Sequence, residues 1–370
     1  MATKRHILQR LQFAQLRSRI ADQLKHFHPK LRKTLLDNLG ELIAAVVMAR
    51  SVQLARIGEE LPVDSTEAGR EQWVRRQLSN DTEDTLHLFR PVAESLLAGF
   101  AGRTVRLILD PTDLANDLTI VTIGLAYQGR ALPLAWATVY IKPDTVKDAI
   151  RLLFAELKQW LPQDAHVYLL ADREFHGEET LQLIQEQGWI PVVRTVGNLR
   201  IELEDGRQCD VKDLAPAPGQ TAFYHKVWLT LWGWGPYSLS LSNARQAKRG
   251  QKPEDPWYIV STEPAGPQML TLYKCRMWLD ETFRDLKSQG FHLEQTRLDR
   301  TERIDRLMLA LVLACWWVIG RGIWVDRMGL RRQVDRAKHP KCSLFTSGLR
   351  WINQLLNRDK MPDVVLVPVL

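Results

Sequence analysis

Two aspartates stand at the ends of runs that are typical of β-strands. Asp110 ends the run RTVRLILD, and Asp172 ends the run HVYLLAD. If these strands lie side by side in one sheet, both carboxylates leave it at the same edge, close enough to share metal ions. Carboxylate oxygens suit Mg²⁺, and two such ions can activate water and stabilise the leaving oxygen of a phosphodiester. Each aspartate alone is also explained by a turn, where this residue is favoured for backbone reasons.

A third acid comes from the stretch YKCRMWLDETFRDLKSQGF, residues 273–291, whose spacing predicts one amphipathic helix. With successive residues placed about 100° apart, its polar positions share one stripe: Tyr273, Arg276, Asp280, Arg284 and Lys287. Asp280 falls beside the apolar, core-facing side of this helix, whereas Glu281 falls about 100° further round the helix than Asp280 and points well away from that side. Helix geometry therefore favours Asp280 as the third acid. Taken alone, the stripe is also explained by a surface ladder of ion pairs, each of which contributes roughly a few tenths of a kcal/mol.

The elements around these acids predict a mixed α/β protein. The first ~100 residues show helical spacing, and three β-rich runs from residue 103 onward suggest an antiparallel meander. A helix, a strand, a second helix and another strand follow, as in a central sheet flanked by helices. Residues 198–262 alternate in strand fashion and are rich in Trp, Gly and Pro, which predicts a β-rich insertion. The apolar run at residues 307–320 is shorter than a bilayer span and predicts a buried helix.

Composition and charge narrow the function further. The four cysteines lack the spacing of a disulfide framework or a zinc site, which favours a reducing cytoplasm. There is no H-E-x-x-H, no G-x-G-x-x-G after a strand and no G-x-x-x-x-G-K-[ST]. The net charge of +7 is uneven: residues 1–50 hold 10 Lys/Arg against 3 Asp/Glu, residues 321–370 hold 10 against 4, and the rest holds 30 against 36. Basic ends suit a protein that binds a polyanion, although solvated helix surfaces explain the same charges.

Three motifs, in this order, resemble the DDE transposases of bacterial insertion sequences. They are LILDPTDL, LLADREFHGEETLQLIQEQGWIPVVRT, and Tyr273-x2-Arg276-x3-Asp280-x6-Lys287 followed by SQGFHLEQTRL. The last resembles the Y-x2-R-x3-E-x6-K signature of insertion sequence family 4, and the resemblance covers about residues 100–320. The chain departs from the signature at Asp280, which stands where the family has glutamate, with Glu281 directly after it. Either Asp280 is the third ligand, or Glu281 becomes so by a local rotation, or this copy is impaired.

The resemblance implies a fold class and a division of the chain. The fold is α/β, with a ribonuclease H-like core, a β-rich insertion and an N-terminal helical DNA-binding domain. The expected segments are a basic, DNA-end-binding helical domain at 1–100, the first part of the core at 101–197, the insertion at 198–262, the second part of the core at 263–325, and a basic C-terminal segment at 326–370.

The resemblance also implies a reaction. Two Mg²⁺ or Mn²⁺ ions would be held by Asp110, Asp172 and either Asp280 or Glu281, for cleavage at the transposon ends and transfer of the freed 3′-OH into target DNA. The residues expected to bind DNA near the scissile bond are Tyr273, Arg276, Lys287, Arg173 and Arg284, although Arg173 is equally explained by a structural ion pair. The partners would be double-stranded DNA, as terminal inverted repeats and target, and a second copy of the chain in a homodimer.

Two points stay open at this stage. A flipped base would need an aromatic platform, and the insertion offers four tryptophans, none of which the sequence selects: Trp228, Trp232, Trp234 and Trp257. The alternatives to a bacterial, cytoplasmic transposase are a nuclease of the same fold without strand transfer, and a catalytically impaired, DNA-binding transposase derivative.

Overall fold

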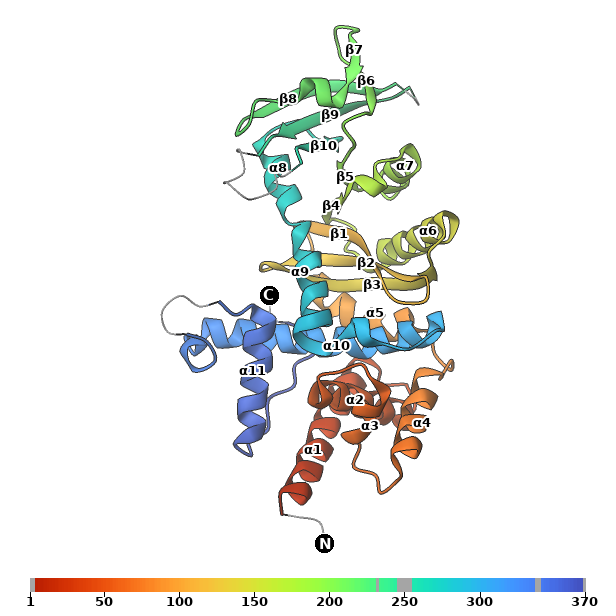
Figure 1. The fold of residues 1–370 in the computed structure, drawn as a ribbon, viewed down its shortest axis with the longest axis vertical. Coiled ribbons are helices and arrows are strands. Elements are labelled where there is room, and N and C mark those ends of the chain that lie inside the picture. Colours follow the sequence, from red (N-terminus) through yellow and green to blue (C-terminus); the bar gives the residue numbers. More distant parts are fainter. Residues whose placement is uncertain (1–3, 231–232, 245–254, 337–340, 369–370) are drawn as a thin grey trace.

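The computed structural model describes residues 4–230, 233–244, 255–336 and 341–368. A mixed sheet and its flanking helices form one end of an elongated molecule, and a group of helices from the N-terminal part of the chain forms the other (Figure 1). Helix α10 (Thr301–Arg327) runs between these two parts. The sheet is what positions the acids predicted above.

Five strands form the part of the sheet nearest to the acids. β1 (Thr104–Asp113), β2 (Leu118–Tyr127) and β3 (Arg130–Tyr140) pair antiparallel, which confirms the predicted meander. β4 (His166–Ala171) then pairs parallel with β1, and β5 (Ile190–Arg194) pairs parallel with β4. Helices α6 (Pro143–Trp160) and α7 (Glu178–Glu186) make the two connections, and their buried leucines and isoleucines pack on the core.

The strands after β5 continue the same sheet. Within the described part of residues 198–262 they are β6 (Arg200–Glu202), β7 (Gln208–Asp210), β8 (Thr221–Leu229), β9 (Trp234–Ser242) and β10 (Trp257–Ser261). Because β10 pairs antiparallel with β5, the sheet has ten strands in the order β3-β2-β1-β4-β5-β10-β9-β8-β6-β7. The region is β-rich as predicted, and its hairpins extend the central sheet instead of forming a sheet of their own.

The N-terminal part of the chain is helical, as its spacing predicts. Its helices are α1 (Lys4–Phe27), α2 (Lys33–Ala49), α3 (Leu54–Glu59), α4 (Glu67–Leu78) and α5 (Thr85–Leu97). α2 is apolar along most of its length because it packs against both α1 and α10. α5 packs against β3 and α10, so the helical part and the sheet share one continuous core.

Helix α10 confirms the predicted buried helix. By length and composition it could cross a membrane, but most of its apolar window is buried inside the protein. Trp316 and Trp317 are fully buried, and Trp316 Nε1 donates a hydrogen bond of 3.1 Å to the Pro133 carbonyl oxygen on β3. Helix α11 (Leu344–Asn357) approaches α10 so closely that a Cβ at Gly322 or Gly348 would collide with backbone atoms of the other helix.

The prediction of one helix over residues 273–291 is wrong. The stretch contains the end of α8 (Pro267–Lys274), then α9 (Met277–Leu286), then a π-helical turn over Lys287–Phe291. At the junction, the backbone N–H groups of Cys275 and Arg276 donate to carbonyls three residues back, which tightens the turn. Tyr273, in α8, is fully buried, so it does not belong to the exposed polar stripe that one straight helix predicts.

Candidate metal and phosphodiester site

Strand register brings the first two aspartates together. Leu109 of β1 pairs with Ala171 of β4, and Asp110 and Asp172 are the next residues along the two strands. Asp172 follows the end of β4 as predicted, but the prediction that Asp110 ends its strand is wrong, because β1 continues to Asp113 through its pairing with β2. Because the two strands are parallel, both side chains emerge at the same edge of the sheet, as the sequence predicts. Asp110 is 5% exposed, so it is the buried member of the two.

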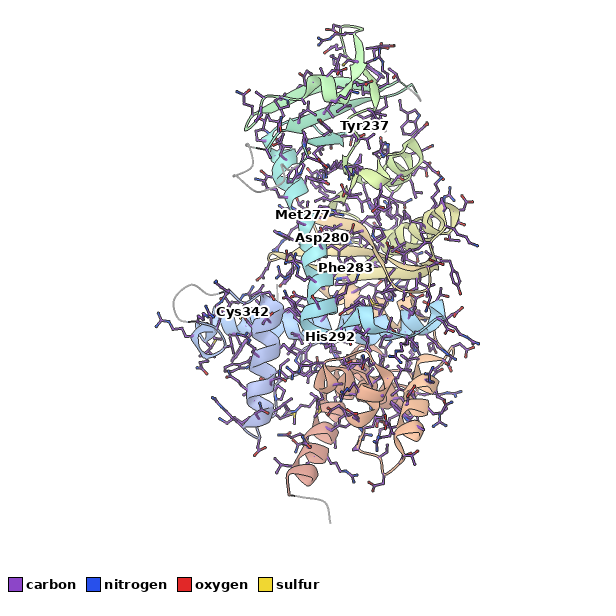
Figure 2. The ribbon with its side chains drawn as sticks, viewed as in Figure 1. Tyr237, Met277, Asp280, Phe283, His292 and Cys342 are labelled. Atoms are coloured by element: carbon purple, nitrogen blue, oxygen red, sulfur yellow. The ribbon has the colours of Figure 1, made fainter. Side chains whose placement is uncertain are left out.

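Helix α9 brings the third aspartate to the same place. Met277, Asp280 and Phe283 follow one another along α9, where it crosses the sheet (Figure 2). Thr282 fixes this crossing, because its hydroxyl donates to the Ala131 carbonyl of β3 at 2.8 Å and accepts from the Ala131 N–H at 3.1 Å. Phe283 and Leu279 are buried against the core, and Asp280 is left at the edge of that face, with its side chain 41% exposed.

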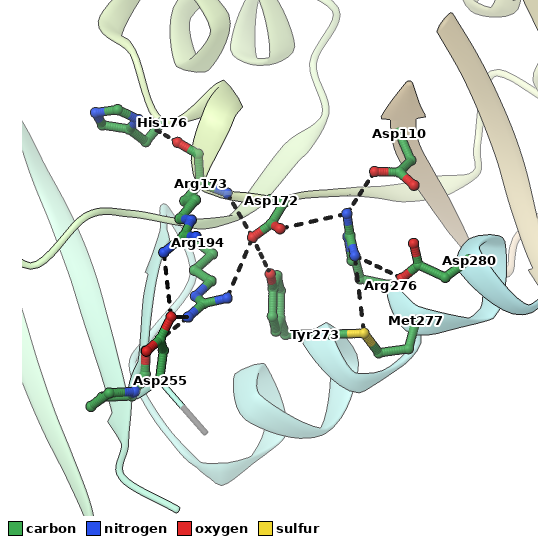
Figure 3. Close-up of polar contacts among 11 residues, drawn as sticks. Asp110, Asp172, Arg173, His176, Arg194, Asp255, Tyr273, Arg276, Met277 and Asp280 are labelled. Carbon is green, nitrogen blue, oxygen red and sulfur yellow. Dashed lines mark hydrogen bonds and ion pairs between the residues drawn. The ribbon is translucent and has the colours of Figure 1, made fainter. Parts of the chain in front are cut away.

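The guanidinium of Arg276 lies between the three aspartates (Figure 3). Its Nη2 donates to Asp110 Oδ1 at 2.6 Å and lies 3.5 Å from Asp172 Oδ2. Its Nη1 donates to Asp280 Oδ2 at 2.7 Å. We call these four residues the Arg276 cluster. One buried cation therefore joins carboxylates from β1, from the end of β4 and from α9.

The two oxygens of Asp172 have different surroundings. Oδ1 accepts from the Arg173 backbone N–H at 2.7 Å and from the Tyr273 hydroxyl at 3.1 Å, and lies 3.7 Å from Arg194 Nη1. Oδ2 faces Arg276. Tyr273, predicted to donate to a DNA phosphate, is instead fully buried and donates to Asp172, with its ring edge-on to Trp257. The carboxylate is thus held through one oxygen and presents the other to the cluster.

Two charged residues behind Asp172, Arg194 and Asp255, were not selected from the sequence. Arg194, at the end of β5, lies between Asp172 and Asp255, 4.0 Å from Asp255 Oδ2. Arg173 is exposed and lies 3.5 Å from the same oxygen of Asp255, which matches the structural ion pair considered for it. The motif LLADREF marked Arg173, but no local signal indicates Arg194, because its place beside Asp172 depends on the pairing of β4 with β5.

Burial and the closeness of like charges change the pKa values of the residues in and near the Arg276 cluster. Burial raises the pKa of Asp110 to about 7; Arg276 opposes this rise and Asp280 adds to it. Burial opposes the charge of Arg276, but the three aspartates outweigh it and raise its pKa, so it stays cationic. Burial, followed by the charge of Asp172, raises the pKa of Glu174, a further acid near the cluster. The cluster therefore holds more negative charge than its arginine neutralises.

Glu281 and Arg284 lie on another side of α9. Glu281 pairs with Arg284 at 3.1 Å and lies 4.0 Å from Arg130 Nη2. Arg130 in turn donates from Nε to Asp285 at 3.0 Å. The structure therefore brings Asp280, and not Glu281, to Asp110. Arg284 keeps its helical phase on α9, and its guanidinium is engaged with Glu281.

The remaining predicted residues lie around the rim of the site. Lys287 Nζ donates to the Asp113 carbonyl oxygen at 3.3 Å, beyond Asp110 on β1. Trp257 lines the site beside Tyr273, whereas Trp228 and Trp234 are half-buried on β8 and β9. Trp232 lies outside the described residues. Of the three tryptophans that the structure describes here, Trp257 is the one with an aromatic contact at the site.

The donor set fits a hard divalent cation. Within the described residues, no three acidic, histidine or cysteine side chains lie close enough to hold an ion together, because the guanidinium of Arg276 separates the aspartates. They nevertheless surround one positive group with carboxylate oxygens, the ligands that Mg²⁺ and Mn²⁺ take. Asp110, Asp172 Oδ2 and Asp280 are the groups that could hold such an ion.

Comparison with known proteins supports one class of protein. Residues 145–317 match a family model described as a transposase DDE domain. The matched residues include Asp172, Arg276 and Asp280 and begin after Asp110. The mixed sheet with its flanking helices is consistent with a ribonuclease H-like transposase domain. No curated protein is similar enough to the chain to be matched to it. The family match supports a DDE transposase, a class that acts on DNA and generally uses divalent metal ions.

Proposed function

We propose that this protein is a cut-and-paste DNA transposase of the insertion sequence family 4 type. It would cleave at transposon ends and join the freed 3′-OH to target DNA. The observation that carries this proposal is the convergence of Asp110, Asp172 and Asp280 on Arg276, at one edge of the sheet in a chain that matches a transposase DDE domain.

Asp110, Asp172 and Asp280 would hold two divalent cations, which when bound would activate a nucleophile and stabilise the leaving oxygen of the phosphodiester. Asp110 supplies a buried carboxylate, Asp172 is fixed through Oδ1, and Asp280 approaches from the open side. Asp280 is preferred over Glu281, because Glu281 is engaged by Arg284 and Arg130. Arg276 and Lys287 would neutralise phosphate oxygens, with Arg276 able to form two parallel hydrogen bonds.

The N-terminal helices would read the terminal inverted repeats. Residues 1–50 hold 10 Lys/Arg against 3 Asp/Glu, and α1 and α2 lie in the part of the molecule opposite the outer strands of the sheet (Figure 1). Because two ends must be cut and joined, the working assembly would be a homodimer on DNA. The nearest alternative is a nuclease of the same fold that hydrolyses DNA without strand transfer.

A pre-cut DNA end separates the two functions. The purified full chain is incubated with Mg²⁺, target DNA, and DNA from the flanks of its coding region that ends in a free 3′-OH. The proposal expects covalent joining of that end to the target, which requires the metal and is lost in Asp172→Ala. Cleavage of DNA without any joining would favour the nuclease, and the absence of both reactions would favour an impaired derivative.

A further inference from the structure

We propose that Arg276 is the resident cation of the Arg276 cluster: it holds the three aspartates together before divalent metal binds, and it leaves them when metal binds. This inference rests on the proposed function, because it takes the cluster to be the metal site. It adds a competition between a side chain of the protein and the metal for the same oxygens, and it links metal binding to the release of a phosphate-binding group.

The first argument is position. Arg276 contacts Asp110 and Asp280 at 2.6 and 2.7 Å, and it faces Asp172 Oδ2 at 3.5 Å. A Mg²⁺ ion needs carboxylate oxygens at about 2.0–2.1 Å in near-octahedral arrangement. The guanidinium fills the space that these ligands enclose, so it cannot keep its present contacts while the same oxygens bind an ion. Occupation by Arg276 and by metal is therefore mutually exclusive.

The second argument is charge. Three carboxylates share one guanidinium inside the cluster, and the neighbouring Arg194 is divided between Asp172 and Asp255. When one or two divalent cations take the place of the guanidinium, two or four positive charges replace one. The three carboxylates are then better neutralised. The exchange is therefore favourable for the aspartates once the arginine has another anion to meet, and a DNA phosphate is the anion that the proposed reaction brings to the site.

The third argument is that Arg276 has few polar contacts other than those with the aspartates. The side chain is 11% exposed, and its Nε finds no hydrogen-bond partner within the described residues. Its other polar contact is a long one of 4.0 Å to the sulfur of Met277. A buried donor without an acceptor costs free energy. The carboxylates are thus what retains Arg276, and the exposed side of Asp280 is the direction in which it can leave.

The test measures Mn²⁺ affinity without DNA, by calorimetry at mildly alkaline pH. Arg276→Gln removes the competing cation and is expected to bind Mn²⁺ about tenfold more tightly than wild type. Arg276→Lys, which keeps one charge but cannot span two carboxylates, is expected to lie between them. Arg151→Gln is the matched control, because Arg151 also pairs with two acids but on the surface of α6, and its affinity should equal that of wild type.

Unfolding temperatures give a second measurement, because a bound ion stabilises the folded state according to its affinity. Mn²⁺ should raise the melting temperature of Arg276→Gln more than that of wild type. If Arg276→Gln does not fold, Arg276→Lys carries the comparison. If wild type binds Mn²⁺ and Asp172→Ala does not, the metal site itself stands. Equal or weaker Mn²⁺ binding in Arg276→Gln, or in Arg276→Lys if the first does not fold, would then overturn this inference but not the proposed function. Failure of both wild type and Arg276→Gln to bind Mn²⁺ would instead overturn the metal site of the proposed function, whereas binding by Arg276→Gln alone would support the inference.

Discussion

Helix α9 carries two buried acid–arginine clusters, and they differ in balance. Near its start, the Arg276 cluster sets three aspartates around one guanidinium, and the side chains of Asp172 and Asp280 are 24% and 41% exposed. Near its end, Asp285 is 1% exposed and receives hydrogen bonds from Arg130 Nε at 3.0 Å and from the Ser343 hydroxyl at 3.3 Å. We call Asp285 and Arg130 the Asp285 pair.

The difference separates a binding site from a structural contact. In the Asp285 pair, one carboxylate meets one guanidinium and a hydroxyl, and the pair is closed to solvent on the acid side. In the Arg276 cluster, the acids outnumber the cation and one side is open, so a further cation can enter. Burial next to an arginine is common to both. An excess of carboxylates with access from solvent is what distinguishes the cluster that we assign to metal.

Matched alanine substitutions should give opposite results in the two clusters. Asp110→Ala is expected to abolish metal-dependent cleavage while the free energy of unfolding stays close to that of wild type, because it relieves the crowding of negative charge. Asp285→Ala leaves Arg130 without its closest partner and should cost on the order of 3 kcal/mol of unfolding free energy, with cleavage by the folded fraction retained. Denaturant unfolding and a cleavage assay on the same samples check both.

The comparison breaks if these outcomes are exchanged. A large loss of stability in Asp110→Ala with cleavage intact would make the Arg276 cluster structural. Loss of cleavage in folded Asp285→Ala would extend the site along α9.

Arg194 tests whether the orientation of Asp172 matters. Arg194→Gln removes a positive group from behind Oδ1 of Asp172, and residues that orient a metal ligand typically contribute about 10–100-fold to activity or metal affinity. We expect cleavage to fall within this range and to recover partly at higher Mg²⁺ concentration, with Arg194→Lys less affected. A loss that does not respond to Mg²⁺ and is not rescued by lysine would make Arg194 a structural residue only.

Asp305 extends the comparison to an acid that accepts hydrogen bonds from uncharged donors. Its Oδ1 accepts from the Thr138 backbone N–H at 2.8 Å and from the Thr138 hydroxyl at 2.6 Å. Burial raises its pKa to about 7, against which the hydrogen bonds of Thr138 act. The folded state therefore binds a proton more tightly than the unfolded chain, so this contribution to stability is full at low pH and is lost as pH rises through about 4 to about 7.

Asp305→Asn should remove this pH dependence, because asparagine keeps the accepting oxygen and carries no charge. The measurement is the difference in unfolding free energy between wild type and variant across this pH range. A difference that does not change with pH would show that the pKa of Asp305 is the same in the folded and unfolded states.

The sequence could predict what depends on local pattern and chain order. Asp110 and Asp172 could be selected because each ends a β-rich run of the sequence, and the parallel pairing of β1 with β4 then brings them together. The preference for Asp280 over Glu281 follows from helix phase within α9, which the break before Met277 leaves intact. The helix pattern does not predict the break or the burial of Tyr273. The contacts of Tyr273 with Asp172 and Trp257 join residues far apart in the sequence, so no local signal indicates them.

Other features could not be predicted for the same reason. The role of Arg194 behind Asp172 requires the β4–β5 pairing, and its contact with Asp255 requires β10 to join β5 across residues 198–262. The insertion was recognised by its strands, but nothing local tells whether those strands extend the main sheet or form another. The placement of Arg276 among three acids depends on all of these elements together.

The most direct test of the account compares two neighbouring acids of α9. Asp280→Asn and Glu281→Gln each remove one charge at the same end of the helix, and both are assayed for Mg²⁺-dependent joining of a pre-cut end to target DNA. We predict that Asp280→Asn loses joining and that Glu281→Gln retains it near the wild-type level. Joining that survives in Asp280→Asn and is lost in Glu281→Gln would contradict the assignment of Asp110, Asp172 and Asp280 as the metal-binding acids.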